Sequence, residues 1–149
     1  NAARLNEEQI YNFIQKNFNF IGDIKKEFKI NDRIFSCKGN TKDFIWFSYR
    51  DFFKQNLAIS DFLAICKKYE WFFIDDFKQY DDYGKDIIRR FIGFIDIAYA
   101  EKVKIKFFIN NDDIKSLYSG EELTLLWGRT LSRLEEMRYI DNKLNDKNY

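Results

Sequence analysis

Gly84-Lys85 is the pair of residues that most resembles part of a catalytic motif, because a P-loop, G-x-x-x-x-G-K-[ST], ends in the same two residues. The first glycine of that pattern falls on Gln79, and the hydroxyl that binds Mg²⁺ falls on Asp86. Without the first glycine the backbone N–H groups cannot form a cradle, and an aspartate at the last position would repel phosphates. We therefore expect no phosphate site here.

Acidic residues follow a short apolar run, in a pattern that resembles the strand of a Walker B motif. The run is Trp71-Phe72-Phe73-Ile74, and it ends in Asp75-Asp76. A turn at the end of a buried strand explains this pattern better than a Mg²⁺ site does, because no P-loop precedes it. With Asp81 and Asp82, these acids lack the spacing and the closing glutamate of a calcium loop. A solvated acidic loop, with no metal, is the expectation.

Arginines are the remaining charged candidates. Arg89 and Arg90 share a helical face with Asp86 and Asp96, and we expect Asp86 to pair with Arg90 four residues later. A second group lies along one stripe of a later helix and comprises Arg129, Arg133 and Glu136. Composition and spacing alone favour local ion pairs for all of them.

Several classes of function are disfavoured by composition. The chain of 149 residues has no histidine, which removes Ser-His-Asp triads and most zinc sites. Its net charge of +1 gives no field that would attract nucleic acid, so its many aromatic residues are expected in the core. Cys37 and Cys66 form no C-x-x-C pair and are expected to be reduced thiols. No apolar run reaches the roughly 20 residues needed to span a bilayer, so a cytosolic setting is expected.

Hydrophobic periodicity predicts an α/β fold. Helices are expected over residues 7–18, 51–55, 60–69, 83–99, 112–118 and 123–139, and strands over 28–30, 34–37, 44–47, 71–74 and 102–109. Turns at Asn31-Asp32 and at Lys38-Gly39-Asn40 would join the first three strands into a small antiparallel meander. Residues 71–109 then read as strand, helix and strand, which implies a parallel βαβ unit.

Three segments follow from this pattern. Residues 1–56 would hold the first helix, the meander and a short helix. Residues 57–139 would hold the βαβ unit and the last helices, and the polar residues 140–149 would form a disordered tail. A single βαβ unit cannot bury both faces of its sheet, so we expect an exposed apolar sheet face.

Two longer motifs resemble one family. R-R-F-I-G-F-I-D-I-A-Y at residues 89–99 and R-T-L-S-R-L-E-E-M at residues 129–137 are similar to motifs of the AFG-like and ZapE family of P-loop (AAA+-type) ATPases. The turn L-Y-S-G at residues 117–120 and W-F-S-Y-R-D-F-F at residues 46–53 also fit, although Phe94 stands where the family has leucine. The resemblance covers nearly the whole chain and corresponds to the carboxy-terminal part of the family.

That resemblance implies the carboxy-terminal part of a P-loop NTPase fold of the RecA/AAA type, whose Walker motifs would lie upstream. ATP and Mg²⁺ would then bind only in the complete protein, and this chain alone would be inactive. By the same resemblance, Arg129 and Arg133 would sense or contact nucleotide. Arg89 or Arg90 would lie at a subunit boundary, with Asp96 and Glu136 in support.

Two functions remain open. In the first, the chain belongs to an ATPase that remodels a partner protein, which in bacteria would be the tubulin-like division ring. Its partners would be the upstream nucleotide-binding portion and further copies of itself, in the bacterial cytoplasm or the mitochondrial matrix. In the second, the chain is a stand-alone, non-catalytic interaction module or a decayed fragment.

Overall fold

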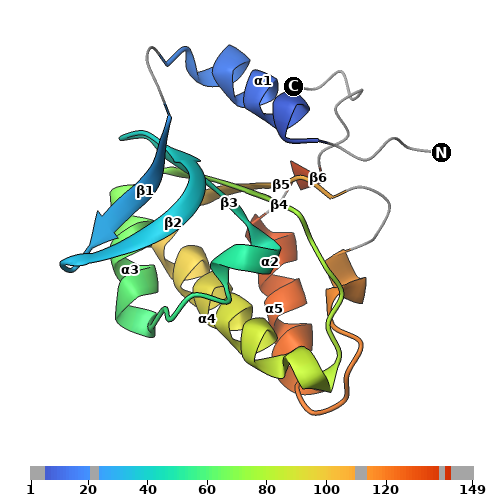
Figure 1. Cartoon of the computed structure of the whole chain (residues 1–149). Helices are drawn as coiled ribbons and strands as arrows, with labels where there is room; N and C mark the ends of the chain where they lie inside the picture. Colours follow the sequence, from blue (N-terminus) through green and yellow to red (C-terminus); the bar gives the residue numbers. More distant parts are fainter. Residues whose placement is uncertain (1–5, 21–23, 110–113, 138–139, 142–149) are drawn as a thin grey trace.

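A single mixed sheet organises the chain. The computed structural model describes residues 6–20, 24–109, 114–137 and 140–141. Its six strands lie side by side in the order in which they occur in the sequence (Figure 1). The first three strands pair antiparallel and the last four pair parallel. The strands are β1 (Lys25–Ile30), β2 (Arg33–Asn40), β3 (Phe44–Ser48), β4 (Trp71–Asp75), β5 (Lys104–Phe107) and β6 (Ile140–Asp141).

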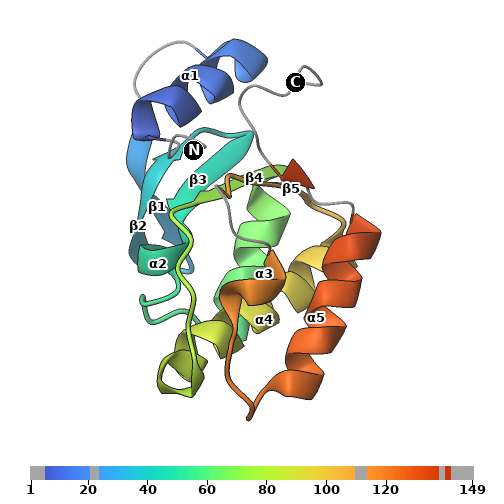
Figure 2. The same cartoon turned by 90° about the vertical axis from the view of Figure 1, so that its right-hand side faces the viewer.

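Helices cover both faces of this sheet, which confirms the α/β class. One helix lies on one face and the others lie on the opposite face (Figures 1 and 2). The helices are α1 (Glu7–Phe18), α2 (Tyr49–Phe52), α3 (Ile59–Lys68), α4 (Lys85–Glu101) and α5 (Thr124–Met137), with 3₁₀ turns η1 (Asp82–Gly84) and η2 (Ile114–Leu117). None of the described helices is long and apolar enough to cross a membrane.

The expected exposed sheet face is wrong, because α1 covers it. Ile10 and Ile14 of α1 are buried against Phe44, Trp46 and Phe73 of the sheet. Asn6 begins the helix with a reciprocal capping pair, in which its side chain accepts from the Gln9 N–H at 2.9 Å. A helix far from the βαβ unit in sequence therefore supplies the second layer.

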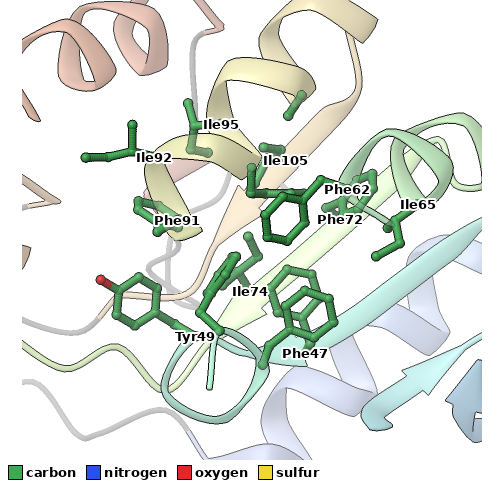
Figure 3. Close-up of a cluster of buried hydrophobic side chains, with 14 of the residues drawn as sticks. Phe47, Tyr49, Phe62, Ile65, Phe72, Ile74, Phe91, Ile92, Ile95 and Ile105 are labelled. Atoms are coloured by element: carbon green, nitrogen blue, oxygen red, sulfur yellow. The ribbon is translucent and has the colours of Figure 1, made fainter. Parts of the chain in front are cut away.

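The larger core lies between the sheet and helices α3, α4 and α5, and aromatic rings and isoleucine side chains pack together in it (Figure 3). Phe47 and Phe72 point into it from the sheet, and Phe62 and Phe91 come from α3 and α4. All four side chains are almost fully buried. Phenylalanine and isoleucine therefore serve as the main core residues, as composition suggested.

The strand order has a consequence for ligand binding. From β3 to β6 each parallel strand is added on the same side of the last, and the intervening helices lie on one face. In open α/β sheets, ligands bind where the strand order reverses and a crevice opens at the carboxyl ends. Within the described residues the order never reverses, so this part of the chain has no such crevice.

Three local predictions were wrong. Lys38, Gly39 and Asn40 belong to β2 and not to a turn, because Gly39 pairs with Trp46 and packs against the Ile24 side chain, with no room for a Cβ. Helix α2 starts two residues earlier than expected because the Ser48 hydroxyl caps it. The remaining error concerns the polar tail.

Residues 140–141 of that tail form β6, which pairs with β5. The short helix expected at 112–118 is η2, and its first two residues lie outside the described residues. The end of the last predicted helix, at 138–139, and the rest of the tail, at 142–149, also lie outside them.

Candidate functional site

Two arginines of α5 converge on one carboxylate of α4. Arg133 donates a hydrogen bond from Nη1 to Oδ1 of Asp96, and Nη2 of Arg129 lies 3.8 Å from the other carboxylate oxygen. The residues are placed by helix geometry, since Arg129 and Arg133 are one turn apart on the same stripe. The sequence predicted the stripe, but the local ion pairs expected for Arg129 and Arg133 are wrong, because their partner, Asp96, lies on another helix.

A tyrosine and a second acid complete this arginine cluster. The guanidinium carbon of Arg133 lies 5.3 Å from the ring centroid of Tyr99. The Tyr99 hydroxyl in turn donates to Glu136, and that hydrogen bond raises the pKa of the tyrosine. Two arginines and two carboxylates leave the cluster without net charge, so in this chain it functions as a tie between α4 and α5.

The arginine cluster remains open to solvent. The side chains of Arg129, Arg133 and Asp96 keep 53%, 29% and 32% of their surface exposed. Ion pairs with that exposure contribute about 0–1 kcal/mol to stability. Arg129 and Arg133 are thus partly accessible from solvent and lie outside the hydrophobic core.

The other two arginines lie elsewhere. Arg89 pairs with Asp86 at 3.7 Å, and both side chains are more than half exposed. Arg90 does not pair with Asp86, which corrects that prediction, and instead donates to the carbonyl oxygen of Phe53 at 3.0 Å. Arg90 thus links α4 to the end of α2 through this hydrogen bond, whereas Arg89 lies on the surface.

A buried ion pair lies at the carboxyl end of β4. Nζ of Lys38 is 2.7 Å from Oδ2 of Asp75 and 3.0 Å from Glu7 at the start of α1. Only 4% of Asp75 is exposed. Lys38 lies 37 residues before Asp75, and sequence reasoning placed it in a turn, so no spacing rule could have found the pair.

Burial changes the acidity of this pair. Desolvation raises the pKa of Asp75 from 3.8 to about 6, although the Lys38 charge acts in the opposite direction. Burial has the largest single effect and lowers the pKa of Lys38, but the charges and hydrogen bonds of Asp75 and Glu7 together outweigh it and raise that pKa overall. Because the folded state holds the Asp75 proton more tightly than the unfolded state does, ionisation of Asp75 destabilises the fold as pH rises.

Replacing Asp75 with asparagine is expected to change the pH dependence of stability. As pH is raised from about 4 to about 7, the free energy of unfolding of the unmodified chain should fall relative to that of Asp75→Asn, so the difference between the two proteins should grow. This change in the difference is at most about 3 kcal/mol, because the pKa of Asp75 rises from 3.8 to about 6 on folding and each tenfold change in proton affinity is worth about 1.4 kcal/mol. Urea unfolding of both proteins at several pH values measures this difference. A difference that stays flat, or that shrinks as pH rises, would contradict it.

The neighbouring acid has no metal-site geometry. Asp76 takes a left-handed backbone conformation with φ of 56°, and its Oδ2 accepts a hydrogen bond from the Ser48 hydroxyl at 2.9 Å. Among the described residues, no group of three or more acidic or cysteine side chains could hold a metal ion. The expectation of a solvated acidic loop is therefore wrong for Asp75, because this residue ends β4 and is buried beside Lys38.

The comparison with protein families agrees with the arginine motifs. A model of the AFG1-like ATPase family matches residues 6–144. The chain belongs to this family. No curated protein and no solved structure matches it. The family relationship inferred from residues 89–99 and 129–137 is thereby confirmed.

The glycine turn of this AFG1-like ATPase chain has a structural reason. The Asp82 carboxylate accepts hydrogen bonds from the Tyr118 hydroxyl and from the backbone N–H groups of Glu121 and Glu122. A Cβ at Gly120 would lie 2.2 Å from the Asp82 carboxylate and 2.6 Å from the Tyr118 ring. The turn therefore joins the start of α4 to the start of α5, and glycine is needed because the carboxylate approaches so closely.

Gly84 likewise has a packing role in this AFG1-like ATPase chain. Its N–H donates to the Asp81 carbonyl oxygen, and a Cβ there would lie 2.3 Å from the Tyr80 ring.

Both cysteines are free thiols, and burial raises the pKa of Cys37 to about 11 and that of Cys66 to about 12. At neutral pH neither thiol is ionised enough to act as a nucleophile.

Proposed function

We propose that this chain is the carboxy-terminal portion of an AFG1-like ATPase of the ZapE type. The observation that supports this most is the family match over residues 6–144 in a chain whose only P-loop-like pair, Gly84-Lys85, departs from the motif at Gln79 and Asp86. The Walker motifs, and with them ATP and Mg²⁺, would belong to an upstream portion. Hydrolysis there would drive remodelling of a partner, which in bacteria would be the tubulin-like division ring.

Arg129 and Arg133 would contact nucleotide in the complete enzyme. They are two partly exposed guanidinium groups that share a single carboxylate, Asp96. A planar guanidinium matches phosphate oxygens as well as it matches a carboxylate, and arginines near a γ-phosphate stabilise the charge of the transition state. Exchange of Asp96 for phosphate would link nucleotide state to the packing of α4 against α5. The exposed Arg89 suits a subunit boundary better than Arg90, which is engaged with Phe53.

A stand-alone interaction module is the second candidate, and one observation favours it. Helix α1 buries the sheet face that would otherwise need a partner, so both sheet faces are covered within the chain. A domain with two complete cores can fold and bind other proteins without an attached ATPase portion. ATP hydrolysis by the complete protein would favour the first candidate, and its absence would favour the second.

Nucleotide binding provides the test. We expect the purified 149-residue chain to show no ATP turnover above background and no saturable Mg²⁺·ATP binding by titration calorimetry, because a phosphate cradle is missing from its sequence. The complete protein, which includes the upstream portion, should bind and hydrolyse ATP. Tight Mg²⁺·ATP binding by the chain alone would contradict the proposal, as would a complete protein without ATPase activity.

A further inference from the structure

Arg50 has no partner within the protein. Of the arginines in the part of the chain that the structure describes, it alone makes neither an ion pair nor a hydrogen bond. Its side chain is only partly exposed, and its Nε is buried. A guanidinium group cannot lose its charge, so one that is drawn out of water needs an anion beside it. No described residue supplies that anion at Nε.

Two tyrosine hydroxyls near Arg50 also lack a protein partner. Tyr49 is fully buried, and neither its hydroxyl nor the buried hydroxyl of Tyr80 makes a hydrogen bond with any described residue. The two ring centroids are 6.1 Å apart, and the Tyr49 hydroxyl points away from the other labelled core side chains (Figure 3). Buried hydroxyls are rarely left unpaired in native proteins, so these two indicate a bound water molecule or ligand.

The tyrosines lie in two segments that follow neighbouring parallel strands. Tyr49 comes directly after β3, and Tyr80 lies in the segment after β4. Phe77 of that segment stacks on the Tyr49 ring with centroids 4.9 Å apart. The Tyr80 N–H donates to the carbonyl oxygen of Leu117 at 2.8 Å. Ring packing and backbone hydrogen bonds therefore hold both hydroxyls in place, so a ligand would meet a preformed site.

Positive and negative charges balance around Tyr80. Burial raises the pKa of Tyr80, and among the neighbouring charges Arg50 has the largest effect and lowers it. The charges of Asp51 and Asp76 raise this pKa, each less strongly. Nζ of Lys78 lies 5.2 Å from the centroid of the Tyr80 ring and adds a second cation. Because the cost of removing an ion from water grows steeply with its charge, surroundings without net charge favour a singly charged anion.

We propose that Arg50, Tyr49 and Tyr80 form a binding site for one carboxylate group of a small molecule. Nε of Arg50 and the two hydroxyls donate hydrogen bonds to the carboxylate oxygens. A carboxylate accepts several such bonds and carries one negative charge, which matches three donors in surroundings without net charge. This site uses none of the arginine cluster, so it is independent of the nucleotide contact proposed for Arg129 and Arg133.

Formate, the smallest carboxylate, is the probe. Sodium formate is titrated into the ¹⁵N-labelled chain at pH 8, and sodium chloride at the same ionic strength serves as the comparison. We expect saturable shifts of the Arg50 Nε–H signal and of the Tyr49 and Tyr80 amides. An ion of three heavy atoms should have a dissociation constant of about 1 mM or weaker.

Two further titrations can contradict the site. Inorganic phosphate is doubly charged at this pH and should bind more weakly than formate, so equal or tighter binding of phosphate would exclude a carboxylate site. An unchanged Arg50 signal, or equal shifts with chloride, would leave water as the partner of these groups and overturn the proposal.

Variants assign the binding to these residues. Tyr49→Phe and Tyr80→Phe each remove one hydroxyl and keep the ring, so formate should bind about fivefold to tenfold more weakly. Arg50→Gln should abolish saturable binding. Asp51→Asn removes a nearby negative charge and should tighten binding. Lys67→Gln removes the same charge as Arg50→Gln from an exposed position on α3, so as the matched control it should leave the affinity unchanged.

Thermal unfolding separates loss of the site from loss of the fold. Without formate, Tyr49→Phe should unfold at the same temperature as the unmodified chain or slightly above it, because it removes a buried hydroxyl that has no protein partner. Saturating formate should raise the midpoint of the unmodified chain and raise that of Tyr49→Phe less. Equal rises in the unmodified chain and in Arg50→Gln would overturn the site.

Discussion

If Arg133 contacts nucleotide in a larger AFG1-like ATPase, as proposed, replacing it with alanine in that enzyme is expected to lower kcat by about 10²–10³-fold. That is the loss measured when one preorganised donor to a developing charge is removed. The reason here is that the Tyr99 ring, 5.3 Å from the guanidinium carbon of Arg133, orients the guanidinium group. Steady-state ATP hydrolysis by the complete protein measures the effect. Arg133→Lys should recover little activity, since an ammonium lacks the planar fork.

Asp96→Asn separates a nucleotide contact from a structural tie. This variant removes the carboxylate that joins α4 to α5 but leaves Arg129 and Arg133 in place, so its thermal midpoint should fall about as much as that of Arg133→Ala. Its kcat should change only a few fold. Lys67→Ala, an exposed basic residue on α3, is the matched control. Equal kcat values for Arg133→Ala and the unmodified enzyme would exclude a nucleotide contact, as would equal losses in Arg133→Ala and Asp96→Asn.

Replacing Phe94 with alanine is expected to lower the free energy of unfolding by about 3–5 kcal/mol. Phe94 is fully buried on α4 at the centre of the larger core. Four ring centroids lie within 6.0 Å of its own, namely those of Phe47 in β3, Phe72 in β4, Phe62 in α3 and Phe53 just after α2. Truncation removes contacts to all of them and leaves a cavity that rigid strands cannot close. Urea unfolding followed by tryptophan fluorescence measures the change.

Phe94→Leu is the informative comparison, because leucine stands at this position in the family that the motifs resemble. Leucine keeps most of the buried apolar volume, so its cost should be no more than about 1–2 kcal/mol. Ile59→Ala changes a side chain that is 70% exposed and should shift stability by less than about 0.5 kcal/mol. A Phe94→Ala loss as small as that of Ile59→Ala would show that the aromatic core is far more loosely packed than the ring distances imply.

Predictions that depend on near neighbours were the accurate ones. Helix α1 has the predicted bounds because the Asn6 cap and the apolar stripe lie within 12 residues of each other. Strand β4 follows from an unbroken apolar run, and it is buried because strands lie on both sides of it and layers cover both its faces. The error at Gly39 came from its contacts with Ile24 and Trp46, which local patterns do not contain. The start of α2 was missed although its cap, Ser48, lies directly before the helix.

The candidate sites were predicted less completely than the elements. The stripe of Arg129 and Arg133 could be found from its spacing, but its partner Asp96 lies on a different helix, 37 residues from Arg133. The pairing of Lys38 with Asp75 joins β2 to β4 across an intervening strand. Such pairs depend on strand order and helix packing, which periodicity does not specify.

The amino-acid sequence by itself determined the family, most of the helices and strands, and the departure of residues 79–86 from the P-loop motif. These features depend on the identity of residues and on hydrogen bonds between close neighbours. Only the tertiary structure decided that α1 closes the second sheet face, that Asp96 joins the two arginines, and that Tyr80 lies beside Tyr49. The reason is that long-range packing selects among many arrangements which satisfy the same local pattern.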